Sequence, residues 1–480
     1  MSSSMSRRVL PLFLAAVMCA AAAIVALRGP DPCAGEPPYF AIKGARIVPV
    51  SGPVIENGTI VIANGVIKAV GANATIPSDA ALIDGAGLTV YPGLIDAMSD
   101  VGLPAAAPTG GGRGGGGGVA ALLAGQANLK QSWGPEDRPA TTPWVLGSDE
   151  FNPADARVQS WRDAGFTTTV STPQGGIFPG QGSIMNLGGD RTEEMTVKPY
   201  ATLPIRLQPD GAYTGFPDSL MGVLAYVHQV FVDTAWGKQA DGIYNAHPSG
   251  LTRPANDRTE RFIDRALAAN EPILFPATTP NQIRRVLWLA PQWVPGSHIV
   301  LYDVQQGYET PSEIAASHFP AIVSLKFPEL PREADAENPP PLRELRVIDR
   351  APSTPGALAK AGVKIAFYSD GLTNPKDMIA NARKAIAAGL SAEAALRAFT
   401  LDAADILGVA DRTGSIEPGK IANLTITDGD LFNEKTKVKI VFVDGQRYEI
   451  HEAPPGPPGG GRGGRGGRGP GEDGSEGGGR

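Results

Sequence analysis

The sequence predicts an α/β fold: a (β/α)8 TIM-like barrel with a composite β-sandwich domain built from both chain ends. Strand-like and helix-like segments alternate through the middle of the chain, which is typical of parallel strands joined by helical crossovers. Stretches rich in β-branched residues precede and follow this region. The 480 residues also exceed the usual barrel size of about 250, which leaves room for a second domain.

The first part of the sandwich is predicted over residues 36–90. Residues 41–50 alternate between apolar and polar types, and residues 54–70 contain two apolar runs separated by Asn64-Gly65, a strong hairpin signal. The second part is predicted over residues 405–452, with strands at residues 422–427 and 438–443. Because a small sheet needs a partner to bury one face, we expect the two parts to form one domain.

The barrel is predicted over residues 91–404. Apolar residues recur at helical spacing after Thr279-Pro280 and again from Met378 to Ile386, and Ser391 precedes a third helical run that continues to Thr400. Between and around these helices we expect strands at residues 167–171, 273–275, 298–303, 321–327 and 364–370.

Residues 1–35 are predicted to be a signal peptide or a membrane anchor. Arg7 and Arg8 form a positive start, and residues 9–27 carry no charge. That uncharged run would span roughly 28 Å as a helix, close to the thickness of a bilayer core. We therefore expect an exported protein, periplasmic or extracellular, and both a cleaved signal and an uncleaved anchor at residues 9–27 stay open.

Composition excludes some classes of protein. The net charge of −7 and the pI near 5.4 argue against a nucleic-acid partner. One of the two cysteines, Cys19, lies within the apolar leader, so a mature chain would retain only Cys33 and form no internal disulfide. Residues 453–480 are rich in glycine and arginine and poor in apolar residues, which predicts a disordered tail.

Several motifs resemble the amidohydrolase superfamily, in particular its imidazolonepropionase-like group. The segment from Pro92 to Asp96, Pro-Gly-Leu-Ile-Asp, resembles the start of the family's first barrel strand. Residues 44–48, 56–58 and 67–71 resemble the group's N-terminal pattern, and residues 403–409 and 414–422 its C-terminal pattern. The resemblance covers residues 40 to 450 and implies a metal-dependent barrel with a β-sandwich from both termini.

In active relatives a divalent metal at the carboxyl ends of the strands lowers the pKa of bound water. The resemblance places the family's metal ligands at five positions of this chain. The two first-strand histidines fall on Met98 and Asp100, the fifth-strand histidine on Pro276, the sixth-strand histidine on Asp303 and the eighth-strand aspartate on Asp370. The imidazole ligands are therefore replaced, and the site is predicted to be degenerate.

Asp100, Asp303 and Asp370 remain at the predicted top of the barrel. Carboxylate oxygens suit hard cations such as Mg²⁺ or Ca²⁺, so one interpretation is an oxygen-only divalent metal site. The other is that the three side chains are solvated remnants, or that one of them binds an N–H or a cation from another group. If the protein is active, the resemblance assigns the role of general base to Asp370.

Two functions follow. The first is hydrolysis of carbon–nitrogen bonds other than peptide bonds, as the resemblance implies, with an altered or absent metal site. The second is a pseudoenzyme that binds a small-molecule ligand or supports an active amidohydrolase partner; a homo-oligomer is the other assembly that we expect. The missing imidazoles favour the second function, because they remove the means of activating water.

Overall fold

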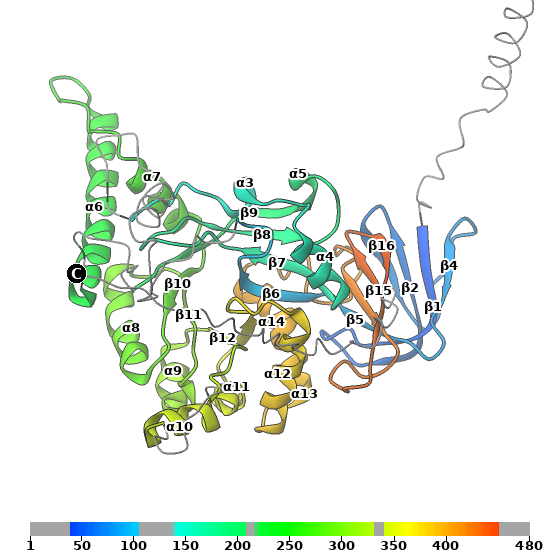
Figure 1. Cartoon of the computed structure of the whole chain (residues 1–480). Helices are drawn as coiled ribbons and strands as arrows, with labels where there is room; N and C mark the ends of the chain where they lie inside the picture. The colour runs from blue at the N-terminus through cyan, green and yellow to red at the C-terminus, as the bar shows by residue number, and fades with distance from the viewer. Residues whose placement is uncertain are drawn as a thin grey trace, which may run out of the picture.

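The computed structural model describes residues 39–104, 138, 140–207, 217, 219–330 and 340–450. It contains two eight-stranded sheets, one built from the two ends of the described chain and one from its middle (Figure 1). The leader predicted in residues 1–35 and the tail predicted in residues 453–480 lie outside the described residues. Among the described residues, no helix combines the length and the apolar character needed to cross a bilayer.

The terminal sheet joins residues from both sides of the barrel, so the predicted composite domain is confirmed. Its strands follow the order β16-β15-β14-β5-β1-β2-β3, and β4 pairs with β1. β14 lies antiparallel to β5, which connects the two halves. The strands are β1 (Tyr39–Ile47), β2 (Ile55–Ala63), β3 (Val66–Gly71), β4 (Ala81–Asp84), β5 (Thr89–Pro92), β14 (Leu424–Thr427), β15 (Val438–Val443) and β16 (Gln446–Glu449).

This sheet curls around its own core. The ring centroids of Phe40 on β1 and Phe442 on β15 lie 5.4 Å apart, although β5 and β14 lie between β1 and β15 in the sheet. The predicted hairpin turn has positive φ at both Asn64 and Gly65, as such a turn requires. A side chain at Gly65 would meet Asp444 at 3.0 Å, so the hairpin tip lies directly against the turn between β15 and β16.

The second sheet is the predicted barrel, in the order β6 to β13, and β13 returns to lie beside β6 (Figure 1). The predicted TIM-like fold is thereby confirmed. The strands are β6 (Leu94–Ser99), β7 (Phe166–Ser171), β8 (Gly182–Asn186), β9 (Thr196–Pro204), β10 (Ile273–Pro276), β11 (Ile299–Tyr302), β12 (Ala321–Ser324) and β13 (Ile365–Tyr368).

One strand departs from the parallel pattern. β8 lies antiparallel to both β7 and β9, whereas β9 to β13 are parallel to one another. The sequence analysis did not identify β8 or β9. Short apolar runs among glycines, as in residues 175–186, carry little periodicity, and a hairpin-like return needs no intervening helix.

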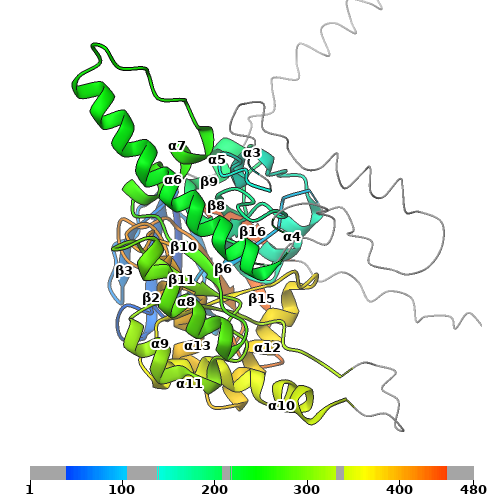
Figure 2. The same cartoon turned by 90° about the vertical axis from the view of Figure 1, so that its left-hand side faces the viewer.

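The helices lie mainly on the outside of the barrel, and α6 and α7 project from it (Figures 1 and 2). The predicted helix starts at Thr279 and Ser391 are confirmed: Thr279 forms a capping box with Gln282, and the Ser391 hydroxyl accepts a hydrogen bond from the Ala394 N–H. The helices are α3 (Gly147–Glu150), α4 (Ala156–Asp163), α5 (Thr192–Met195), α6 (Leu220–Ala246), α7 (Arg258–Ala268), α8 (Pro280–Trp293), α9 (Pro311–Ser317), α10 (Leu342–Arg350), α11 (Thr354–Lys360), α12 (Pro375–Ala387), α13 (Ala392–Phe399) and α14 (Leu401–Ile406), with 3₁₀ turns at Gly307–Glu309 and Ala351–Ser353.

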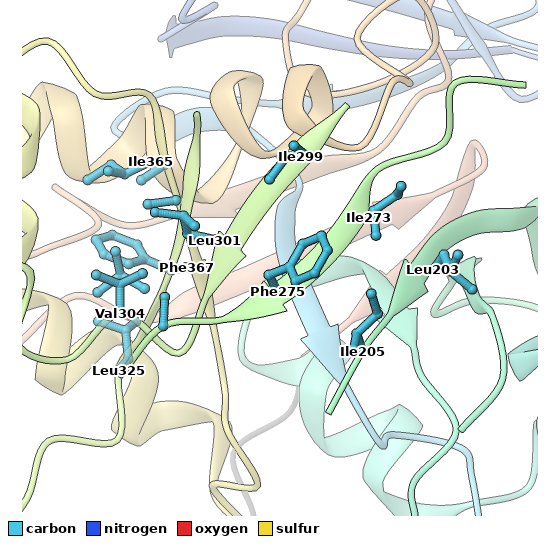
Figure 3. Close-up of a cluster of buried hydrophobic side chains, with 14 of the residues drawn as sticks. Leu203, Ile205, Ile273, Phe275, Ile299, Leu301, Val304, Leu325, Ile365 and Phe367 are labelled. Carbon is cyan, nitrogen blue, oxygen red and sulfur yellow. The ribbon is translucent and has the colours of Figure 1, made fainter. Parts of the chain in front are cut away.

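Alternation along the strands divides the barrel core in two. On β13, Ile365 and Phe367 belong to the cluster between the strands and the outer helices (Figure 3), whereas Ala366 and Tyr368 face the barrel interior. The interior cluster also includes Ile406 and other residues of α14. α14 therefore packs against the interior of the barrel and forms its floor, at the amino ends of the strands.

Candidate functional site at the mouth of the barrel

The carboxyl ends of β6, β10, β11 and β13 carry the residues that the sequence analysis selected. Asp100, Asp303 and Asp370 each follow a strand within two residues, and Pro276 is the last residue of β10. Pro276 pairs in register with Tyr302, the residue before Asp303. Parallel strands thus bring these positions to one edge, the mouth of the barrel.

Asp303 is a largely buried carboxylate with two protein donors. The Thr278 hydroxyl donates to one of its oxygens at 2.5 Å, and the Gln305 side-chain amide donates to the other at 3.2 Å. Its backbone has a positive φ of 58°, a conformation that aspartate tolerates better than most residues. Burial raises the pKa of the Asp303 carboxyl to about 6, although the hydrogen bond from Thr278 opposes the shift.

Asp370 is the second carboxylate of the mouth, and it lies near enough to Asp303 for the two charges to repel. The Ser324 hydroxyl donates to it at 2.9 Å, and Lys326 Nζ donates to its backbone carbonyl at 3.3 Å. Burial raises the pKa of Asp370, while Ser324 and the charge of Lys326 lower it. The Tyr368 hydroxyl lies within hydrogen-bonding reach of both carboxyl groups.

Asp100 is engaged elsewhere. Arg157 Nη1 lies 3.1 Å from its carboxylate, and the same guanidinium also binds Asp155 at 2.7 Å and donates to the Leu103 carbonyl at 2.6 Å. The side chains of Asp100 and Arg157 are 35% and 31% exposed, so this ion pair is partly solvated. Asp100 therefore has a counter-ion of its own, apart from Asp303 and Asp370.

A fourth carboxylate, Asp96 on β6, is buried between the barrel wall and α4 and connects β6 to the end of β13. The Trp161 indole N–H donates to it at 3.2 Å, and the Ser369 backbone N–H donates at 3.0 Å. Complete burial raises the pKa of Asp96 to about 7, against the lowering effect of these donors. Because Ser369 immediately precedes Asp370, Asp96 helps to position the end of β13.

The residues at the mouth do not fit a divalent metal. Met98 offers a thioether and Pro276 no donor atom, and Asp100 already pairs with Arg157. Across the described ranges, no three His, Cys, Asp or Glu side chains gather in a way that would hold a metal ion. Of the three carboxylates predicted to share a hard cation, the structure brings together only Asp303 and Asp370.

Sequence reasoning missed the residues that satisfy these carboxylates. Thr278, Ser324 and Arg157 occupy no motif, and their roles arise because β10, β12 and α4 bring them beside partners distant in sequence. The sequence offered a weak indication for Tyr368. It lies two residues before Asp370, and side chains two residues apart on a strand lie on the same face.

Comparisons with known proteins agree with this architecture. Residues 330–448 match the model of the amidohydrolase family. Similar solved structures include an amidohydrolase from Thermotoga maritima MSB8, with 24% identity and a TM-score of 0.68 over 85% of this chain and 100% of that one. A prolidase complexed with N-methylphosphonate-L-proline has 17% identity and a TM-score of 0.51, over 86% and 99% of the two chains. A Xaa-Pro dipeptidase with bound methionine has 15% identity and a TM-score of 0.51, over 86% and 100%.

No curated protein matches the chain by sequence. The structural likenesses, all below 25% identity, show the shared fold, while the family match covers the region from the end of β12 to the terminal sheet. The imidazolonepropionase-like group stays a prediction. Residues 330–448 therefore match the amidohydrolase family, and the described chain shares its fold with these solved structures.

Proposed function

We propose that this protein is an exported amidohydrolase-family protein that binds a small cationic molecule at its barrel mouth and does not activate water through a metal. One observation carries the proposal. Two partly buried carboxylates, Asp303 and Asp370, lie close enough to repel each other, and the positions that the resemblance aligns with imidazoles hold Met98, Asp100, Pro276 and Asp303. A protonated amine between the two carboxylates would relieve that repulsion without a metal.

The donors around the pair support an organic cation over a bare metal ion. Thr278 and Ser324 each occupy a carboxylate oxygen, and these hydroxyls can also accept a hydrogen bond from an ammonium group. A divalent metal would need several oxygens at about 2.3–2.6 Å, and here they are already shared with protein donors. An amine needs only one or two acceptors at hydrogen-bond distance.

Binding and metal content test this proposal. We expect putrescine to bind, while 1,4-butanediol, of the same length but uncharged, does not; isothermal titration calorimetry at pH 7.5 measures both. The double variant Asp303→Asn, Asp370→Asn should lose putrescine binding, and the exposed control Asp241→Asn should keep it. Equal binding of the diol and the diamine, or binding unchanged in the double variant, would refute the cationic site.

Metal analysis tests the second part of the proposal, that the protein does not use a metal to activate water. Protein produced with zinc and manganese should contain less than about a tenth of an equivalent of either metal. A variant with histidine restored at positions 98, 100, 276 and 303 should contain more, because imidazoles complete a donor set around Asp370. Stoichiometric metal in the wild-type protein would contradict the proposal directly.

A second function, hydrolysis of non-peptide carbon–nitrogen bonds, has one observation in its favour. Asp303 and Asp370 are adjacent carboxyl groups in different environments, and such pairs act elsewhere as general acid and base. In that case Asp370 is the base, and turnover of aminoacyl or lactam substrates should disappear in Asp370→Asn. If the wild-type protein shows no turnover, the hydrolytic function is refuted and the binding function is retained.

Export, the anchor at residues 9–27 and the partners are part of the same proposal. Cell fractionation of the full chain should place it outside the cytoplasm, and carbonate washing should separate an anchored from a released form. Light scattering and a pull-down test for a homo-oligomer and for an active amidohydrolase partner. Cytoplasmic recovery of the full chain would refute export.

A further inference from the structure

A cavity of about 560 Å³ lies at the amino ends of β11, β12 and β13, opposite the mouth. It opens between α9, α14 and the segments that enter these strands. Its size is within the range of small-molecule sites, about 300–1,000 Å³. In barrels of this kind catalysis takes place at the carboxyl ends of the strands, so this cavity is separate from the candidate site above.

The inner wall of the cavity is apolar. Ile314 of α9, Ile406 of α14 and Ile299 of β11 line it and are almost completely buried. Val363, just before β13, is also buried. Neighbouring residues cover these side chains, so the apolar surface open to a ligand comes from Phe319 and Pro320, which are partly exposed.

The charged groups around His298 are two lysines, Lys364 and Lys198, and one carboxylate, Asp405. Lys364 and Asp405 form an ion pair at the cavity, with side chains 47% and 48% exposed. His298 and His318 also line the cavity, and Lys198 on β9 lies near enough to repel a charge on His298. Asp405 is the one carboxylate among the described lining residues.

The pKa of the His298 imidazole depends on these neighbouring groups. Burial lowers the pKa of its imidazole, Lys198 and Lys364 lower it further, and Asp405 alone among its charged neighbours in the described chain raises it. A neutral imidazole keeps one N–H donor for a ligand. An anion in the cavity would add a negative charge beside His298 and compete with Asp405 for Lys364.

We propose that this cavity is a second binding site, for a small organic anion with an apolar body. The anion would pair with Lys364 and accept a hydrogen bond from His298, while its body would lie against Phe319 and Pro320. α14 lines the cavity and also closes the amino-terminal end of the barrel, so a bound anion would also stabilise the folded barrel.

Benzoate is a suitable probe, because it combines a carboxylate with an aromatic body. Titration of the full-length protein with benzoate should saturate and should raise the pKa of His298, followed by NMR of the imidazole Cε1–H with His298→Gln as the assignment control. Benzamide, which has the same shape without the charge, should bind at least fivefold more weakly. Inorganic phosphate, which lacks the apolar body, should also bind at least fivefold more weakly.

Matched variants locate the site. Lys364→Met should weaken benzoate at least fivefold, whereas Lys435→Met, an exposed lysine in the terminal domain, should leave it unchanged. Ala315→Trp should fill the cavity and abolish binding while leaving putrescine binding at the mouth intact, which separates this proposal from the previous one. Benzamide binding as tightly as benzoate, or benzoate unaffected by both Lys364→Met and Ala315→Trp, would overturn it.

Discussion

The two ends of the barrel use charged residues in opposite ways. At the mouth, the carboxylates of Asp303 and Asp370 are held by Thr278, Gln305 and Ser324. At the floor, Lys364 and two histidines line an open cavity whose described wall contains a single carboxylate, Asp405. The mouth holds two neighbouring carboxylates that accept hydrogen bonds from the protein, whereas the floor pairs one lysine with one carboxylate beside a cavity.

This difference shows how one fold can change where it binds. At the mouth, positions that the sequence resemblance aligns with metal ligands carry side chains that bond to other parts of the protein, as Asp100 does with Arg157. At the floor, α14 closes the interior yet leaves a cavity beside it. Under the two binding proposals, the charged groups at the strand ends, more than the strand order, determine which ligand each end binds.

The largest effect is expected where the floor is packed. Ile406→Ala removes a side chain that is 1% exposed and that contacts the barrel interior, so the free energy of unfolding should fall by about 3 kcal/mol. Urea denaturation measures the change. Leu82→Ala, at a residue 62% exposed, is the control and should change stability by less than about 0.5 kcal/mol. A small effect at Ile406 would show that α14 is no structural floor.

A smaller and pH-dependent effect is expected at the mouth. Because the pKa of Asp303 is about 6 in the folded protein and 3.8 for an ordinary carboxyl, its contribution to the folded state is fully present below about pH 4 and is lost as pH rises through 6. Asp303→Asn removes this dependence, so the variant should gain about 2.5 kcal/mol relative to wild type between pH 4 and pH 8.

Denaturation curves at both pH values measure the Asp303 effect. In Asp303→Asn, the introduced amide retains an oxygen for the Gln305 donor, and the Thr278 hydroxyl can turn to accept from the amide N–H. Asp79→Ala, at an exposed position, should shift stability by less than about 0.5 kcal/mol at either pH. A constant difference between Asp303→Asn and wild type would mean that burial does not raise the pKa of Asp303.

The smallest effect is expected on the pKa of Asp370, one of the two carboxylates at the mouth. Ser324→Ala removes the hydroxyl that donates to Asp370, and since that hydrogen bond lowers the carboxyl pKa, the pKa of Asp370 should rise. Carboxyl ¹³C titration by NMR measures the shift. Ser353→Ala, whose hydroxyl donates to the Arg350 carbonyl, should leave the Asp370 titration unchanged. A fall in the Asp370 pKa in Ser324→Ala would contradict the assigned contact.

Much of the fold could be predicted from local sequence, because strand and helix periods and turn chemistry are local properties. Asn64-Gly65 indicated a hairpin and Thr279-Pro280 a helix start, and both are found. The antiparallel strand β8 was missed, since its direction depends on pairing with β7 and β9 and not on its own residues.

The sequence by itself determined which residue types reach the mouth: the segment from Pro92 to Asp96 leads into β6, and Met98, Pro276 and Asp303 lie where the resemblance requires imidazoles. Only the tertiary structure decided the partners of the remaining carboxylates, because Arg157, Thr278 and Ser324 come from separate elements. The floor cavity also arises from packing, since α9, α14 and three strand ends must meet to enclose it. Long-range contacts of this kind leave no periodic signal in the chain.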